Sequence, residues 1–545
     1  MIRLHSLLGA ITATAALLSF AAPAEAQKKI ELDKAQKIKD WGYEIRTLKG
    51  WNSMPADQEE RFTVGRWKFD VSELRKRGDY EAMQAGELSE LKVIRIARET
   101  ETGEKPPKTE EEEAKEKTRE VILPKSLLKR QNIKSFEDWI EAEYEGASKR
   151  WTRENFKGAK MPGELIEFGS GVHALTIGYF QKDGVDWAVV YSAFEEINRK
   201  TWREWYVKSL QTFEVTAKVD PAAAAAAKKD VTQLVGAEKR EALKQSIAGN
   251  PGWYAIDTTY YVFLSNATNK QFVSNLAKDM ETMREKAYIP LFRPRNQDIP
   301  LSPVRVFNTQ AEYHQYGGPR GSAGYFRPDR GELVLFVQFE GESKSESKDN
   351  CRSVMFHEGF HQYVHFSVGD VSPHSWFNEG HGDYFAGAFV TGGGWKVKPF
   401  DWRVQLLKAH LAEKRDLIAC KTLVRMPQSE YYSNAGLKYA QGWALVYYLR
   451  EVSKKKEHQK ILDNYFNYLA DNVAAFRAKQ KEKKEGEEDD DLGGESIPGI
   501  PGIRFVNFED SEKVEQILSE AVDKAFEGVD FEELDKGLRA WLEKI

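Results

Sequence analysis

The stretch His357-Glu358-Gly359-Phe360-His361 limits what this 545-residue chain can fold into more than any other feature. Residues four apart lie on one face of an α-helix, so a helix here directs both histidines at one point. Neutral imidazoles at this spacing suit a zinc ion, and Glu358, one step round the helix, is placed to act as a base. The sequence therefore predicts a helix that carries a zinc site. The competing interpretation is a buried helix with two core histidines.

A second block, residues 378–383, reads Asn-Glu-Gly-His-Gly-Asp and supplies a third candidate ligand, Glu379. Three protein ligands leave one coordination position open, which is typical of a catalytic zinc rather than a structural one. The chain has only 10 histidines, so chance rarely produces this arrangement. His365, His374 and His381 lie close by in sequence, and packing or a supporting contact is the simpler interpretation for each. Donation to an oxyanion is the alternative for His374 and His381.

Composition narrows the class of protein. Charged residues make up 30% of the chain and hydrophobic residues 41%, which fits a folded globular protein. The length favours about two to four domains. The net charge of -5 gives no general attraction to nucleic acid, so we expect no nucleic-acid partner.

Residues 1–26 have the layout of a signal peptide. Arg3 and His5 precede an apolar stretch from Leu7 to Ala22, and Ala24-Glu25-Ala26 is a cleavage-site pattern. The apolar stretch is short for a membrane span, and no later segment is apolar enough to cross a bilayer. We therefore expect export to the periplasm or the extracellular space, with no stable membrane span after cleavage. An uncleaved anchor is the alternative.

Only two cysteines occur, Cys351 and Cys420. Export would allow a disulfide between them, because oxidising compartments preserve such bonds. Two separate buried thiols are equally compatible with the sequence, and neither outcome affects the zinc site.

Residues 27–220 are expected to form a β-rich N-terminal domain. Short runs of aromatic and β-branched residues recur there, and Lys182-Asp183-Gly184 separates two of them as a hairpin turn. A charged insertion at about 98–162 interrupts this pattern and is expected to be a solvated helix or disordered. An Ala-rich helical linker follows over 221–250.

Residues 251–545 are expected to form a second domain, so the predicted fold class is α+β. It begins as a small mixed sheet and becomes mainly helical. Its sheet ends in a hairpin whose second strand, Leu333 to Phe339, is expected at the sheet edge. Asp349 or Asn350 is expected to cap the helix that carries the two histidines. A charged surface loop is expected at about 477–503.

The motif His357-Glu358-x-x-His361 with Asn378-Glu379-x-x-x-Asp383 resembles the gluzincin metallopeptidases, to which thermolysin and the alanyl-aminopeptidase family belong. The layout over about 254–545 looks most like the peptidase-MA-like exported bacterial proteins of poorly defined role. The resemblance implies that Glu379 is the third zinc ligand, that Asp383 orients His357, and that Asn378 supports His361. The gap between His361 and Glu379 is one residue shorter than in the aminopeptidase pattern.

A further stretch, Tyr439-Ala440-Gln441-Gly442, resembles the Tyr-x-Lys-Gly segment of the aminopeptidase family, with Gln441 in place of the lysine. The resemblance implies that the Tyr439 hydroxyl stabilises the oxyanion of the reaction. Tyr431 and Tyr432 are reserve candidates for this role. A buried helix aromatic is the competing interpretation of Tyr439.

The resemblance implies hydrolysis of a peptide or protein substrate by a zinc-activated water, with Glu358 as the general base. The G-x-M-E-N strand that grips a substrate's free amine in the aminopeptidases is absent before His357. Endopeptidase action is therefore favoured over aminopeptidase action. Two alternatives stay open: a zinc-containing binding or scaffold protein of the cell envelope without turnover, and an enzyme that hydrolyses a non-peptide bond. The sequence leaves the oligomeric state open.

Overall fold

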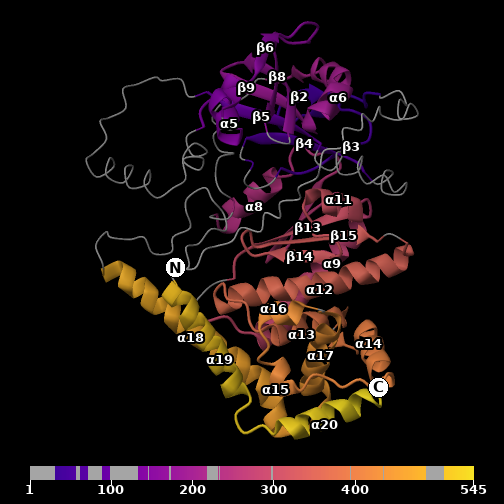
Figure 1. The fold of residues 1–545 in the computed structure, drawn as a ribbon, viewed down its shortest axis with the longest axis vertical. Helices are drawn as coiled ribbons and strands as arrows, with labels where there is room; N and C mark the ends of the chain where they lie inside the picture. Colours follow the sequence, from indigo (N-terminus) through magenta and orange to yellow (C-terminus); the bar gives the residue numbers. More distant parts are fainter. Residues whose placement is uncertain are drawn as a thin grey trace, which may run out of the picture.

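The computed structural model describes residues 31–56, 60, 62–71, 89–98, 133–144, 146–170, 173–217, 231, 234–295, 299–339, 341–392, 394–433, 435–486 and 508–545. The fold is mixed α+β: a β-rich N-terminal region is followed by a small mixed sheet and a mainly helical half (Figure 1). The predicted signal peptide, residues 1–26, lies outside the described residues.

The N-terminal region is built on a seven-stranded antiparallel sheet in the order β3-β4-β5-β9-β8-β7-β6. Its strands are β3 (Trp51–Ser53), β4 (Thr63–Phe69), β5 (Glu90–Ala97), β6 (Thr152–Asn155), β7 (Gly163–Ser170), β8 (His173–Lys182) and β9 (Val185–Phe194). The predicted hairpin joins β8 to β9 through Asp183 and Gly184, whose φ values are 52° and 73°. Two consecutive positive φ angles are what a tight two-residue hairpin needs, so this prediction is confirmed.

Both faces of this sheet are covered. One face packs against α6 (Glu195–Leu210) and a three-stranded sheet of β1 (Gln36–Ile38), β2 (Tyr43–Ile45) and β10 (Glu214–Val215). The other face packs against α5 (Phe136–Glu143), which buries Phe136 and Ile140. The sheet is therefore the middle layer of three.

The expected charged insertion at 98–162 is wrong for its second half. Residues 133–144 and 146–162 belong to the domain, because α5 buries its aromatic side chains against the sheet and β6 adds the last strand. The sequence pattern was misleading because the long charged stretch before residue 133 outweighs the few apolar residues that follow it. Residues 99–132 lie outside the described part of the chain.

The predicted linker contains a helix, α8 (Gly236–Gln245), while its alanine run at 222–227 lies outside the described residues. The two regions of the chain are in contact. The indole of Trp41 donates to the carbonyl oxygen of Ala248 at 2.9 Å, and Gln315 Nε2 donates to the carbonyl oxygen of Phe69 at 2.7 Å. Met54 is fully buried in the same interface.

A five-stranded mixed sheet in the order β11-β12-β13-β15-β14 opens the second region. Its strands are β11 (Tyr254–Asp257), β12 (Tyr261–Ser265), β13 (Ser302–Thr309), β14 (Gly324–Arg327) and β15 (Glu332–Gln338). The expected hairpin is present, but the expectation that its second strand forms the edge is wrong. β15 lies inside the sheet because it pairs in parallel with β13, which leaves β14 at the edge.

Helix α12 (Lys344–Val368) carries His357, Glu358 and His361 and lies between this sheet and the helical half (Figure 1). Its cap is Ser343, whose side chain accepts from the N–H of Glu346 in a capping box, and not Asp349 or Asn350. The helix starts earlier than expected because this box satisfies its first free N–H groups. It ends at Gly369, whose φ of 90° suits glycine.

The chain between β12 and β13 and between β13 and β14 is mainly helical: α9 (Lys270–Met283), η4 (Arg284–Tyr288), α10 (Ile289–Leu291) and α11 (Gln310–Tyr316). After α12 come α13 (Ser375–Ala386), the hairpin β16 (Ala388–Thr391) and β17 (Gly394–Val397), α14 (Asp401–Ala412), α15 (Cys420–Leu423), α16 (Gln428–Tyr432), α17 (Ala435–Tyr447), η5 (Tyr448–Val452), α18 (Lys456–Gly486), α19 (Phe508–Ala525) and α20 (Phe531–Leu542). Helices α19 and α20 close the chain.

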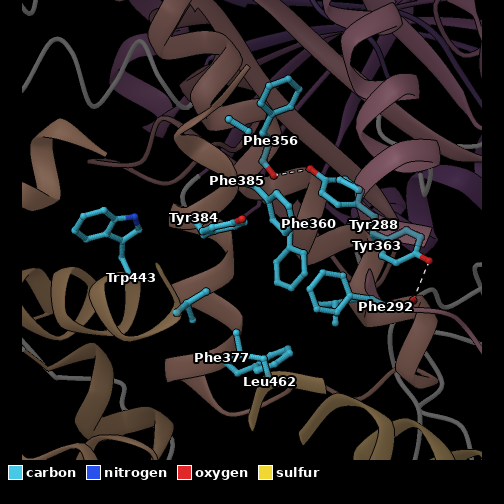
Figure 2. Packing of buried hydrophobic residues seen from close by; sticks show 14 of the residues in the cluster. Tyr288, Phe292, Phe356, Phe360, Tyr363, Phe377, Tyr384, Phe385, Trp443 and Leu462 are labelled. Atoms are coloured by element: carbon cyan, nitrogen blue, oxygen red, sulfur yellow. Dashed lines mark hydrogen bonds between the residues drawn. The ribbon is translucent and has the colours of Figure 1, made fainter. Parts of the chain in front are cut away.

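Aromatic side chains form the centre of this core, as Figure 2 shows for Phe292, Phe360 and Phe385. Two buried hydroxyls donate to backbone carbonyl oxygens (Figure 2). The hydroxyl of Tyr288 lies 3.0 Å from the carbonyl oxygen of Phe356, and the hydroxyl of Tyr363 lies 3.0 Å from that of Phe292. These bonds hold helix α12 against the segment that follows α9.

The structure also bears on the expected loop at 477–503 and on the two cysteines. The expected loop at 477–503 is wrong for residues 477–486, which continue α18; residues 487–507 lie outside the described part. Cys351 and Cys420 are both buried free thiols, so the disulfide alternative is not formed. Among the described residues, none of the helices combines the length and apolar character that crossing a bilayer requires.

Candidate metal centre

The three predicted metal ligands lie together between α12 and α13. His357 and His361 project from one face of α12, and their Nε2 atoms are 3.0 Å apart. Oε2 of Glu379 on α13 lies 3.3 Å from His357 Nε2 and 3.4 Å from His361 Nε2. The ligand atoms of His357, His361 and Glu379 all lie within 4.8 Å of one another, close enough to share a metal ion.

The spacing of these atoms fits zinc. Zinc binds histidine nitrogen and carboxylate oxygen at about 2.0–2.2 Å in a tetrahedron, which separates neighbouring ligand atoms by roughly 3.4 Å. The three separations here, 3.0, 3.3 and 3.4 Å, are close to that tetrahedral edge. Three protein ligands fill three corners and leave the fourth for water or substrate.

The outer nitrogen of each imidazole is also held. His361 Nδ1 lies 2.9 Å from Asn378 Oδ1, and His357 Nδ1 lies 3.2 Å from Asp383 Oδ1. Each Nδ1–H can donate to its oxygen, which would leave the Nε2 lone pair available to a metal ion. Both contacts agree with the sequence-based expectation for Asn378 and Asp383, and the roles that they imply stay predictions.

A glycine makes this approach of α12 and α13 possible. A Cβ on Gly382 would lie 2.8 Å from Cε1 and 2.9 Å from Nδ1 of His357. Any larger residue would therefore push the imidazole away from its position. The pattern Gly-His-Gly in the second block reflects close packing as much as chemistry.

The site is strongly charged despite its burial. Burial disfavours protonated His357, but hydrogen bonds to Asp383 and Glu379 outweigh it and raise its pKa. Burial likewise opposes ionised Glu379, yet the charge of His361 and the hydrogen bonds to both histidines hold its pKa well below the usual range. In the metal-free protein, zinc therefore competes with protons for the two imidazoles.

Glu358 follows His357 on α12, and its side chain approaches the edge strand. A Cβ on Gly324 of β14 would lie 3.3 Å from Glu358 Cγ. The charge of Glu358 also raises the pKa of both His357 and His361, although it is a smaller cause than burial. The predicted base therefore lies close both to the candidate metal ligands and to strand β14.

Three tyrosines surround the carboxylate of Glu379. The hydroxyl of Tyr432 donates to Glu379 Oε1 at 2.5 Å. The ring of Tyr439 lies 6.0 Å from that of Tyr432 and 5.7 Å from that of Tyr431. Burial, followed by the charge of Glu379, raises the pKa of Tyr439, so its phenol stays protonated. The structure thus brings Tyr439 to the site and adds Tyr432, a reserve candidate, as a direct partner of the ligand.

The three other histidines close to the motif in sequence, His365, His374 and His381, have partners within the protein. His381 is fully buried, its Nδ1 donates to the carbonyl oxygen of Phe377 at 2.8 Å, and its Nε2 accepts from Arg450 at 3.0 Å. His374 Nδ1 lies 2.9 Å from the hydroxyl of Tyr465. His365 Nε2 lies 3.2 Å from Asp370. These contacts agree with packing or supporting roles.

One residue at the site has no sequence signature. Nε of Arg403, on α14, donates to Asp383 Oδ2 at 2.6 Å. A lone arginine twenty positions after Asp383 matches no spacing rule, because α14 returns to the site only through tertiary packing. Sequence reasoning therefore missed it.

Comparisons with known proteins place the chain in no family. No protein-family model matches it, and no curated protein matches it. The solution structure of cyanobacterial PsbP (CyanoP) from Synechocystis sp. PCC 6803 aligns with 36% of this chain and 98% of its own, at 10% sequence identity and a TM-score of 0.20. A similarity at that level carries no conclusion about fold or function.

Proposed function

We propose that this protein is an exported zinc-dependent metallopeptidase that cleaves peptide bonds within a chain. The observation that carries the proposal is the triangle of His357 Nε2, His361 Nε2 and Glu379 Oε2, with sides of 3.0, 3.3 and 3.4 Å. The presence of Glu358 beside it favours catalysis, because a purely structural site has no use for that carboxylate. Zinc in such a site acidifies water and polarises a carbonyl group.

Glu358 is the proposed general base. Its carboxylate takes a proton from the attacking water and passes it to the leaving amine as the peptide bond breaks. Its place next to His357 on α12 keeps the two backbones one helical step apart. The edge strand β14 lies on its other side, near Gly324.

Tyr439 is the proposed oxyanion donor. A phenol that stays protonated in a buried site can donate to the oxygen on which negative charge develops. Tyr432 is already bonded to Glu379 Oε1. The phenol of Tyr439 also lies within hydrogen-bonding reach of Glu379. We assign Tyr432 to holding the ligand carboxylate and Tyr439, the residue that matches the family motif, to the substrate.

The edge strand β14 is the proposed place where substrate backbone pairs. In the described part of the sheet its neighbour on one side is β15, and its other side carries no strand. An extended peptide added there would run beside α12, which β14 adjoins through Gly324, Val354 and Glu358. Main-chain pairing is sequence-tolerant, which suits cleavage within peptides and proteins.

Export is proposed from the signal-peptide pattern of residues 1–26. The periplasm or the extracellular space would then be the place of action.

The test is digestion of a broad peptide library by purified mature protein beside Glu358→Gln. Cleavage by the wild type at internal bonds, lost in the variant, is the expected result. Zinc bound without any cleavage would favour the scaffold alternative, and cleavage of a non-peptide ester or amide alone would favour the other enzyme class.

A further inference from the structure

We propose that Arg403 is a positioning residue that holds the metal ligand His357 and the phenol Tyr439 in one fixed arrangement. The inference rests on the proposed function, because it assigns a role at the same site. It is carried by contacts of the Arg403 side chain with residues from two other helices, α13 and α17.

The first contact is with the partner of a ligand. Arg403 Nε lies 2.6 Å from Asp383 Oδ2, and the other oxygen of that carboxylate lies 3.2 Å from His357 Nδ1. The side chains of Arg403 and Asp383 are only 7% and 3% exposed. Each oxygen of Asp383 therefore has its own partner in a place that water barely reaches.

The second contact is with the proposed oxyanion donor. The guanidinium carbon of Arg403 lies 5.2 Å from the centre of the Tyr439 ring, within cation–π range. It lies 4.4 Å from the ring of Trp402, which is 60% exposed. The same cation thus donates a hydrogen bond to Asp383 and lies over two aromatic rings.

This combination explains why the residue is arginine. A guanidinium is planar, always charged and able to hydrogen-bond in its plane while it stacks, whereas a lysine ammonium offers a point charge. His357, Asp383, Arg403 and Tyr439 come from α12, α13, α14 and α17. Arg403 therefore ties four helices together at the point where a ligand and a donor must stay in register.

The consequence for zinc is specific. Without Arg403, the carboxylate of Asp383 loses one of its two partners and gains freedom to rotate away from His357. Loss of such outer partners typically lowers metal affinity or activity by about 10–100-fold. Loss of the cation under Tyr439 also loosens the ring that donates to the substrate, which should lower kcat more than it raises KM.

The experiment is a zinc-affinity measurement by chelator competition on the full mature protein, for wild type, Arg403→Gln, Arg403→Lys, Asp383→Asn and the double variant Asp383→Asn/Arg403→Gln. We expect Arg403→Gln to weaken zinc binding by about 10-fold or more and to lower kcat with little change in KM. Arg403→Lys should lose less zinc affinity, because it keeps the charge. The double variant should lose no more affinity than Asp383→Asn alone, because both changes break one connected set.

The matched control is Arg415→Gln, which removes an arginine near the end of α14 whose partner is the exposed Glu413. It should leave zinc affinity and kcat unchanged. If Arg403→Gln folds and binds zinc as tightly as the wild type, the inference about Arg403 is overturned while the proposed function stands. If Arg403→Gln does not fold, wild-type zinc affinity and an unchanged kcat in Arg403→Lys would overturn the inference. A wild-type protein that binds no zinc would instead overturn the proposed function.

Discussion

Gly380 on α13 lies directly against the carbonyl oxygen of Gly442 on α17. A Cβ on Gly380 would be 2.7 Å from that oxygen and 2.8 Å from Val446 Cγ2. The two helices therefore cross with their backbones in contact. This crossing sets Glu379, one residue before Gly380, beside Tyr439, one turn before Gly442.

Gly380→Ala should disturb both stability and the site. The added methyl group meets backbone, which cannot rotate away, so we expect a loss of about 1–3 kcal/mol in the free energy of unfolding. We also expect weaker zinc binding, because Glu379 moves with the helix. The control is Gly436→Ala in α17, where a Cβ would meet only Leu406 Cδ1 at 3.8 Å. Equal stability of the two variants in denaturant unfolding would contradict the role assigned to the crossing.

The two site tyrosines should separate kinetically. Tyr439→Phe removes the proposed oxyanion donor, so we expect kcat to fall by about 10²–10³ with zinc retained. Tyr432→Phe removes the donor to Glu379 Oε1, so we expect a weaker zinc affinity and a smaller loss of kcat. Steady-state kinetics at saturating zinc would check this. If Tyr432→Phe loses more kcat than Tyr439→Phe, the roles assigned to the two tyrosines are the wrong way round.

Gly324→Ala should impair cleavage while the metal stays bound. Its Cβ would lie 2.6 Å from Val354 Cγ1 and 3.3 Å from Glu358 Cγ, so β14 and the base must move apart. We expect a fall in kcat/KM of roughly tenfold and zinc affinity within about twofold of wild type. Gly169→Ala in β7, where the nearest atom is 4.0 Å away, is the matched strand control. Unchanged cleavage by Gly324→Ala would argue against β14 as part of the site.

His374 should make the fold less stable in mild acid. Burial, with a smaller effect of Arg425, lowers its pKa from the usual 6.5 to about 4. Its neutral Nδ1 accepts from the hydroxyl of Tyr465, which in turn accepts from the His374 backbone N–H at 2.9 Å. Protonation would cost that bond.

The direction follows from comparing the two states. Above pH 6.5 the ring is neutral whether folded or unfolded, so its contribution is fully present. As pH falls toward 4, the unfolded chain takes up a proton that the folded protein refuses, and the free energy of unfolding decreases by up to about 3 kcal/mol. His374→Gln should flatten this part of the pH profile in urea unfolding. A profile that stays as steep as that of the wild type would contradict the assignment.

Local patterns predicted much of the structure. The positions expected for Asn378 and Asp383 beside the histidines came from the family resemblance of the second block and not from a local pattern. By contrast, Asp183-Gly184 specified a hairpin, and the spacing of His357 and His361 specified a shared helix face. Each of these features depends on a few neighbouring residues or on helix geometry, so the sequence alone constrains it.

Features that depend on tertiary packing were harder to predict. β14 and β15 are adjacent in sequence, and nothing local says which of them pairs with β13. The burial of α5 depends on a sheet built from both sides of the charged segment. Arg403 reaches Asp383 only because α14 folds back, so its contact depends on the tertiary structure and cannot be read from the distance between the two residues in the sequence.

The most direct test of the account is zinc titration of chelator-treated, metal-free protein, with peptide cleavage followed at each addition. We predict that cleavage is absent at the start, rises in proportion to zinc and stops rising at one equivalent per chain. Glu358→Gln should bind the same single equivalent without cleavage. Cleavage that survives removal of the metal, or an active protein whose zinc uptake does not depend on His361 and Glu379, would contradict the central claim.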